Sequence, residues 1–287
     1  MSKLIEIRRR IKSTKNIHQI TKAMEMVSAV KLQKSQMILE KNKKYIENLE
    51  KSVKEVMSYK DFQDNINTND SLIIIVSPSK GFVGPLVTNL EKKTKEVIEK
   101  NKNKKFKIIG IGKKSLNFIF SLGCEVIDQV NLTENTDIEE LYIVSDIILE
   151  DIFNNKLKEV YIIYNKFINI LTNEIISEKI FPIDIEEKDF DKTHYIKQKE
   201  SDPPSIYDLE MNFDDIYEKT LKLYIPSKIQ SCIIESVTAE NAIRMITMRN
   251  AADNAEDLNS SLVFQSNKIR QSSITQEVIE IASASNI

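Results

Sequence analysis

Two turns that follow predicted strands hold the residues best able to carry chemistry. Residues 77–84 read SPSKGFVG, and the second turn contains Gly110, Gly112 and Ser115. A dinucleotide-binding loop requires glycine at the position of Ser115, because the helix must approach the strand closely there. A phosphate-cradling GxxxxGK[ST] motif is absent from the sequence. The spacing therefore favours simple turn geometry over a nucleotide site in both places.

Cysteine and histidine are too few and too scattered for a metal centre. Cys124, Cys232, His18 and His194 are the only residues of these two types, and they share no ligand spacing. The sequence contains no GxSxG or HExxH motif, and its dispersed carboxylates define no acid–base pair. We therefore predict no catalytic, cofactor-binding or metal-binding residue in this chain, and we expect each cysteine to be a small buried apolar group.

The composition is that of a globular chain with little net charge. The 287 residues are 41% apolar and 29% charged, and 41 basic residues oppose 43 acidic ones for a net charge of −2. This global charge favours neither a nucleic-acid binder nor an acidic tail. The longest apolar run, residues 72–76, is far below the ~20 residues of a membrane span. We therefore expect no direct membrane insertion.

Residues 70–204 carry the pattern of an α/β domain. Short β-branched runs at 72–76, 106–111, 125–130 and 159–164 alternate with helical segments at 86–100, 115–122 and 138–154. This alternation predicts a mostly parallel, Rossmann-like sheet with helices on its faces. Residues 168–182 suggest one more strand, antiparallel if it follows directly. The charged stretch 184–204 is expected to be a linker into the last helix.

The two ends of the chain lack the residues that interrupt helices. Residues 1–77 and 227–287 contain neither glycine nor proline, which favours one long helix over 1–58 and another over 205–287. Apolar residues recur at steps of three and four along both, so we expect an antiparallel coiled coil. Pro226 should break or bend the second helix, because it cannot donate to the carbonyl of Lys222. The stripe expected on the first helix includes Ile7, Ile11, His18, Met24, Val27 and Lys31.

The two ends also differ in charge. Residues 1–60 carry 15 basic and 6 acidic side chains, whereas residues 205–287 carry 7 and 12. These charges are complementary in an antiparallel pair. The basic side chains of residues 1–34 leave several interpretations open: a solvated face, a helix that binds nucleic acid or an anionic membrane, and a docking face for an acidic protein. A mitochondrial transit peptide is disfavoured, since the helical stripe continues past residue 31 without a break.

Motifs at four places along the chain resemble one protein family. Residues 20–29 read ITKAMEMVSA, residues 165–167 read NKF, residues 240–248 read ENAIRMITM and residues 267–281 read NKIRQSSITQEVIEI. In this order they are similar to the gamma subunit of the rotary F-type ATP synthase, the central shaft of that complex. The resemblance spans nearly the whole chain.

The resemblance implies a non-catalytic rotor subunit of a proton-translocating complex. Its helix pair would turn inside a ring of three alpha and three beta subunits, while its α/β domain would sit with the epsilon subunit on the membrane c-ring. Rotation would couple c-ring movement to conformational cycling of the beta catalytic sites. The subunit would be peripheral to a bacterial cell membrane, on its cytoplasmic face, and would bind no cofactor and no nucleic acid.

The resemblance also assigns partner contacts to seven residues near the two ends of the chain. Met24 of the first helix would face the contact residues of the second helix, and these polar groups would meet mobile loops of the beta subunits. The seven residues are Lys22, Met24, Arg244, Arg270, Gln271, Thr275 and Glu277.

The chain departs from the family's pattern in its first loop and at its end. The family's first loop reads SxD[KR]GLCGGLN. This chain differs from it at the aspartate, cysteine, second glycine and asparagine positions, where it has Ser79, Val83, Pro85 and Val87. The last helix reaches Ala284 and Ser285 where the family has a Gly-Ala pair, so it should extend. Two other classes compete with the resemblance: a nucleic-acid-binding or oligomerising coiled coil with an α/β domain, and a small α/β enzyme with a site at 77–84 or 110–113.

Overall fold

The computed structural model describes residues 2–57, 68–101, 103–130, 138–183 and 213–284. The chain forms two compact units, one made of residues 1–31 and 241–287 and the other of residues 32–240. The division falls inside each of the two long helices. The linker expected over 184–204 and the start of the C-terminal segment expected at 205 lie outside the described residues.

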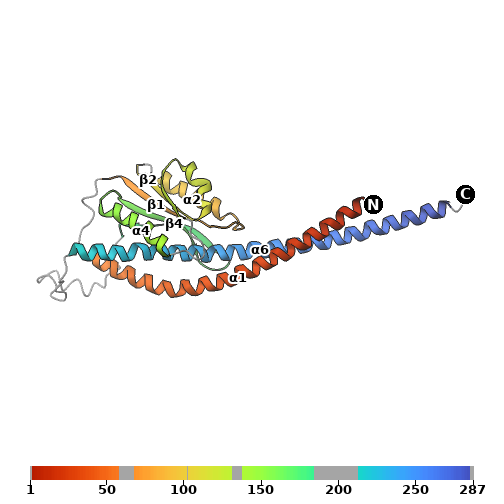
Figure 1. Cartoon of the computed structure of the whole chain (residues 1–287), viewed down its shortest axis with the longest axis horizontal. Helices are drawn as coiled ribbons and strands as arrows, with labels where there is room; N and C mark the ends of the chain where they lie inside the picture. The colour runs from red at the N-terminus through yellow and green to blue at the C-terminus, as the bar shows by residue number, and fades with distance from the viewer. Residues whose placement is uncertain (1, 58–67, 102, 131–137, 184–212, 285–287) are drawn as a thin grey trace. The chain divides into compact units, whose positions relative to one another are not determined.

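The larger unit is built on a five-stranded sheet (Figure 1). Its strands are β1 (Asp70–Val76), β2 (Lys105–Ile111), β3 (Glu125–Val130), β4 (Glu159–Phe167) and β5 (Asn173–Phe181), in the order β3-β2-β1-β4-β5. The first four are parallel, and β5 runs antiparallel to β4. The mostly parallel α/β sheet is therefore confirmed, including the antiparallel final strand.

Helices cover both faces of this sheet. The helix α2 (Leu86–Lys100) buries Leu86, Leu90 and Val97 and contacts β4 and β5, whereas α4 (Ile138–Phe153) packs on the opposite face. The predicted helix over 115–122 is instead three short pieces, namely η1 (Lys113–Ser115), α3 (Leu116–Ile119) and η2 (Phe120–Leu122). A helix of only a few residues forms too few internal hydrogen bonds to hold one regular geometry.

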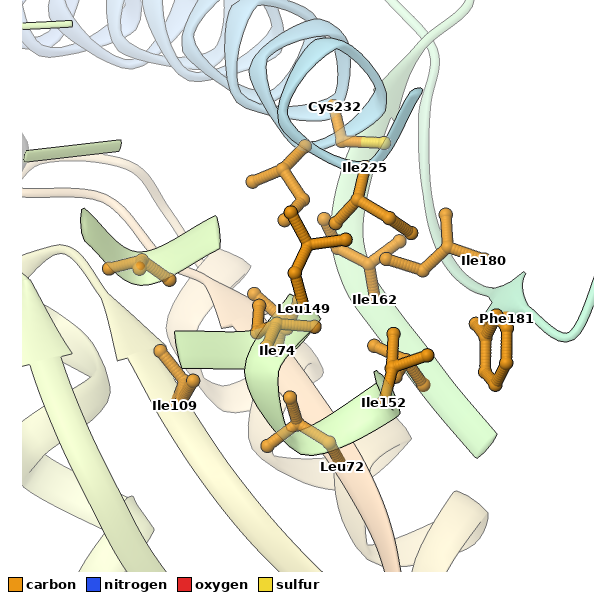
Figure 2. Packing of buried hydrophobic residues seen from close by; sticks show 14 of the residues in the cluster. Leu72, Ile74, Ile109, Leu149, Ile152, Ile162, Ile180, Phe181, Ile225 and Cys232 are labelled. Carbon is orange, nitrogen blue, oxygen red and sulfur yellow. The ribbon is translucent and has the colours of Figure 1, made fainter. Parts of the chain in front are cut away.

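The main hydrophobic core lies between the sheet, α4 and the helix α6 (Phe213–Ala284) (Figure 2). Alternate residues of β1, Leu72 and Ile74, face it together with Ile162 of β4, and α6 contributes Ile225. Burial of one such side chain stabilises a fold by about 1.5–3 kcal/mol. The residues between them on β1, Ile73 and Ile75, are also fully buried, as expected for a parallel sheet covered on both faces.

The two long helices predicted at the ends of the chain are confirmed. The first, α1, spans Ser2–Met57, and α6 runs from Phe213 without interruption to Ala284. Of the break or bend expected at Pro226, the break is wrong, because Pro226 lies inside the continuous helix α6. Pro226 is buried, and Leu221, Ile225 and Ile229 pack into the core around it, so tertiary packing offsets the missing backbone hydrogen bond.

Candidate functional site

The smaller unit is an antiparallel pair of helical segments from α1 and α6. His18 Nδ1 donates to the carbonyl of Ala252 over 3.0 Å, and Arg249 Nε donates to Glu25 Oε1 over 2.8 Å. The residue numbers rise along α1 while they fall along α6, which makes the pairing antiparallel. The predicted antiparallel association of the two ends is thus confirmed in this unit.

The seam of this pair follows a strict alternation of steps of four and three. On α1 the more buried positions continue from Ile7 and Ile11 through Thr14, His18, Thr21, Glu25 and Ser28. On α6 the positions at this spacing are Asn241, Met245, Met248, Ala252, Ala255, Asn259, Leu262, Ser266 and Ile269, and near the start of the unit Ala242 and Arg244 are buried as well. This is the heptad pattern of a coiled coil with many polar and small residues at the seam. The two helices can therefore approach closely, but they bury little apolar surface between them.

The stripe expected from the sequence drifts off this seam in α1. Met24 is only half-buried and Val27 is 55% exposed, whereas Glu25 and Ser28 are buried. The expectation followed apolar residues, and the seam from Thr14 onward consists largely of polar ones. The heptad step continued from Ile7 and Ile11 was the signal that would have found Glu25.

Glu25 is the electrostatic centre of the unit. Its Oε2 accepts from Lys22 Nζ at 2.8 Å and its Oε1 from Arg249 Nε at 2.8 Å, so both oxygens are used. The side chain of Glu25 is only 9% exposed, while Lys22 and Arg249 are about half exposed. The hydrogen bond from Lys22, with that from Arg249, outweighs burial and lowers the pKa of Glu25 below its usual value. The contact stabilises the ionised carboxylate and joins the two helices.

The lowered pKa of Glu25 predicts an acid-sensitive contact. The stabilisation is present above the ordinary glutamate pKa of about 4.5 and is lost as the pH falls through the lower folded value. Glu25→Gln should therefore reduce the pH dependence of thermal unfolding below pH ~4.5 and leave the protein less stable at pH 7. Thermal melts from pH 3 to 7 measure this, with Glu6→Gln, in an exposed ion pair with Arg10, as control. If the melting temperatures of wild type and Glu25→Gln changed with pH in parallel, the prediction would be contradicted.

Arg244, assigned to partner contact from the resemblance, is buried within this chain. It is 7% exposed, and its Nη1 lies 3.4 Å from Asn241 Oδ1, one turn earlier on α6. Arg249, which the sequence reasoning passed over, makes the ion pair that crosses the seam. Lys22 reaches Glu25 on its own helix, so all three basic groups here have partners within the chain.

The other four assigned residues lie near the end of α6. Arg270, Gln271, Thr275 and Glu277 are exposed, and Thr275 Oγ1 donates to the carbonyl of Gln271 at 2.9 Å. The antiparallel register places the start of α1 level with about residue 270. Residues from there to Ala284 therefore extend beyond the paired region of the two helices.

The expectation that Met24 faces these four residues needs correction. Glu25 lies beside Arg249, so Met24 is level with that part of α6. At a rise of 1.5 Å per residue, Arg270 to Glu277 lie roughly 30 to 40 Å further along the helix. The contact residues named from the resemblance thus form two separate groups, one at the Glu25 crossing and one on the extended end of α6.

The extended end of α6 also displays apolar side chains. Ile274, Val278, Ile279 and Ile281 are between 52% and 70% exposed, interspersed with Gln271, Thr275 and Glu277. The spacing of Ile274, Val278 and Ile281 places these three on one face of the helix, and an exposed apolar face is typical of a segment that another protein covers. This end is therefore the strongest candidate for partner binding in the smaller unit.

The two turns considered for nucleotide binding bind each other instead. The backbone N–H of Ser115 donates to Ser77 Oγ at 2.8 Å, that of Gly112 to the carbonyl of Val130 at 2.8 Å, and that of Lys114 to the carbonyl of Pro78 at 3.1 Å. These are the backbone donors that a phosphate would need. The geometry supports the interpretation of Gly112 as a turn residue, whereas Gly110 lies inside β2 and pairs with Ile75 and Gln129, which corrects the expectation for it.

The cysteines and the remaining chemical groups offer no reactive centre among the described residues. Cys232 is buried as expected, whereas Cys124 is only half-buried, which corrects the expectation for it. Burial raises the pKa of the Cys124 thiol and so disfavours its reactive thiolate. Within the described ranges, no group of three or more histidine, cysteine or carboxylate side chains could hold a metal ion, and no helix is long and apolar enough to cross a membrane.

Comparisons with known proteins agree on one family. The family model described as ATP synthase matches residues 3–286. The ATP synthase gamma chain of Clostridium botulinum (strain Langeland) is 31% identical over 283 residues, covering 97% of this chain and 95% of that protein. The gamma chain of Psychrobacter sp. is 30% identical, with coverages of 98% and 97%. A chain of the Euglena gracilis mitochondrial ATP synthase rotor has a similar fold, with a TM-score of 0.65 at 17% identity over 95% of this chain and 99% of that one.

Proposed function

The chain belongs to the ATP synthase gamma-chain family, and from this membership we propose that it is the rotary central stalk of an F-type ATP synthase. The match over residues 3–286 carries the proposal, together with relatives of 30% identity or more that are covered almost end to end. The resemblance identified in the motifs of both helices and in the NKF strand is confirmed by this membership.

The helical unit has the physical properties that a shaft requires. A shaft must resist bending, and α1 and α6 contain no glycine, with Pro226 of α6 held in packed surroundings. It must also turn within its bearing without locking. The exposed Ile274, Val278 and Ile279 would lie against an apolar sleeve, which stabilises the helix without fixing one orientation. The polar groups beside them, Gln271 and Thr275, would make contacts that differ from one rotary state to the next.

The partners follow from the same assignment. Three alpha and three beta subunits would surround the paired helices, while the sheet-bearing unit would contact the epsilon subunit and the membrane c-ring. Rotation of the shaft would favour open and closed states of the beta sites in turn, because each state contacts it differently.

The proposed function also implies whether the subunit is catalytic and where in the cell it is located. The subunit would perform no catalysis itself, and the backbone N–H groups of Ser77, Gly112, Lys114 and Ser115 are already used within the fold. It would be peripheral, on the cytoplasmic face of a bacterial cell membrane, in a complex that moves protons. The nucleic-acid alternative depended on the basic residues of 1–34, and no described contact favours it over family membership.

Assembly with catalytic subunits tests the function directly. The purified chain should hydrolyse no ATP and bind it weakly at best, whereas mixing it with alpha and beta subunits from the same genome should give a complex with robust ATPase activity. A bead attached to the sheet-bearing unit should then rotate in one direction when ATP is added. Alpha and beta subunits without the chain are the control. A tight, saturable ATP site on the purified chain, or an active complex that excludes the chain, would refute the proposal.

A further inference from the structure

The turn of α6 at Pro226 has a local weakness. Proline has no backbone N–H, so the carbonyl of Lys222 lacks its usual partner within the helix. Such positions normally kink or open a helix unless neighbouring contacts hold them. The helix nevertheless continues through this turn, and the residues directly after Pro226 show what holds it.

Ser227 and Lys228 connect this turn to two other elements of the larger unit. Lys228 Nζ lies 2.6 Å from Glu50 Oε1 of α1 and 2.7 Å from Glu178 Oε1 of β5. Ser227 Oγ lies 3.5 Å from the hydroxyl of Tyr45 of α1. One ammonium group therefore joins α1, β5 and α6 within two residues of the weakened turn. We call Lys228, Glu50 and Glu178 the Lys228 clamp.

The three charges of the Lys228 clamp are partly buried, so each depends on its partners for stabilisation. The side chain of Lys228 is 10% exposed, and the two carboxylates are about one-third exposed. Tyr164 of β4 donates its hydroxyl to the second oxygen of Glu178 at 3.3 Å, and apolar Ile225 and Ile229 lie on either side along α6. In such a setting, an ion pair with one partner removed leaves an uncompensated, poorly hydrated charge.

Lys228 stays protonated in this position at any physiological pH. Burial disfavours its charge, but the carboxylates of Glu178 and Glu50 outweigh burial and raise the pKa of Lys228 above its usual value. The other titratable groups around it are Tyr224, Cys232 and Glu235 of α6 and Tyr164 of β4. Without the ammonium, two carboxylates of different elements would face each other across the joint.

We propose that Lys228 is a positioning residue that locks the Pro226 turn of α6 to α1 and to the sheet, so that force passes between the sheet and the helices without opening this turn. The part of the proposal that concerns force depends on the proposed function as a rotary stalk. The part that concerns the locked turn does not, and it can be measured on the purified full-length chain.

Amide hydrogen exchange tests the lock. Lys228→Met should raise exchange over residues 223–233 by about tenfold or more, because loss of the ammonium frees a turn that already lacks one hydrogen bond. Lys228→Arg keeps the charge and should stay close to wild type. Lys222→Met is the matched control, since Lys222 forms an exposed ion pair with Glu218 on the same helix at 2.5 Å. Equal exchange in Lys228→Met and Lys222→Met would overturn the proposal.

A milder variant covers the case in which Lys228→Met does not fold. Glu178→Gln leaves the pair between Lys228 and Glu50 in place and removes one charge of the clamp. Its exchange over the same residues should rise by roughly threefold. Wild-type exchange in Glu178→Gln would then overturn the lock.

The assembled complex tests the transmission of force. A Lys228→Met complex should hydrolyse ATP at close to the wild-type rate and pump roughly threefold fewer protons per ATP, because an opened turn absorbs rotation. Full pumping despite faster exchange would overturn the role in transmission. Failure of the wild-type chain to join alpha and beta subunits would instead refute the stalk function and leave the exchange result standing.

Discussion

Replacing Gly112 by alanine will unfold or severely destabilise the sheet-bearing unit. Gly112 follows β2 with a φ of +93°, a region that residues with a side chain rarely adopt. A Cβ built there would lie 2.0 Å from the carbonyl oxygen of Ser77, which is backbone and cannot rotate away. We expect a loss of about 3–5 kcal/mol, from backbone strain and from the separation of the β1 and β2 turns.

Alanine variants at two other glycines distinguish the effect of backbone strain from that of the steric clash. Gly123 has a φ of +69° and open space around its Cβ position, so Gly123→Ala should show strain alone, about 1 kcal/mol. Gly81 has open space and no unusual φ, and its replacement by alanine should be nearly neutral. Urea denaturation of the three variants measures the differences. A Gly112→Ala protein as stable as Gly81→Ala would show that the two turns are not tied together as described.

Replacing both Gln271 and Thr275 by alanine will slow the assembled motor while leaving the chain folded. Both side chains are exposed on the extended end of α6, and their only described hydrogen bond, from Thr275 to the carbonyl of Gln271, is local. Their removal costs the isolated chain little. In a complex where they meet polar groups of the beta subunits in some rotary states, two lost hydrogen bonds would raise a barrier by about 1–3 kcal/mol, or roughly fivefold to a hundredfold in rate.

The measurement compares assembly with turnover. The double variant should join alpha and beta subunits in wild-type yield and show ATP hydrolysis and synthesis lowered by about tenfold. Gln265→Ala, at another exposed glutamine of α6 within the paired region, is the matched control and should retain wild-type rates. Unchanged turnover and coupling in the double variant would remove Gln271 and Thr275 from the set of partner contacts.

The strands and helices of this protein could be predicted from its sequence, because they depend on the types of neighbouring residues. The run 72–76 is short, rich in β-branched residues and followed by a turn, which predicts a strand buried on both faces, and the structure places it at the centre of the sheet. The absence of glycine and proline over 1–58 and 227–287 left no strong breaker within these stretches of the two helices. The motifs at the two ends, such as ITKAMEMVSA, were long enough to identify the family before any fold was known.

Contacts between residues distant in the sequence follow no local rule. The sequence analysis therefore missed such contacts or predicted their effects wrongly. An isolated acidic residue in a basic segment is typical of a solvated face, so the sequence does not single out Glu25. Its ion pair with Lys22 is local, but the ion pair that joins the two helices comes from Arg249, more than 200 residues away. The missing N–H of Pro226 predicts a break or bend in its helix. The packing that keeps the helix continuous involves side chains from other elements, which the local sequence does not reveal. Charges and packing act between residues that are close in space, and that closeness exists only after the chain has folded.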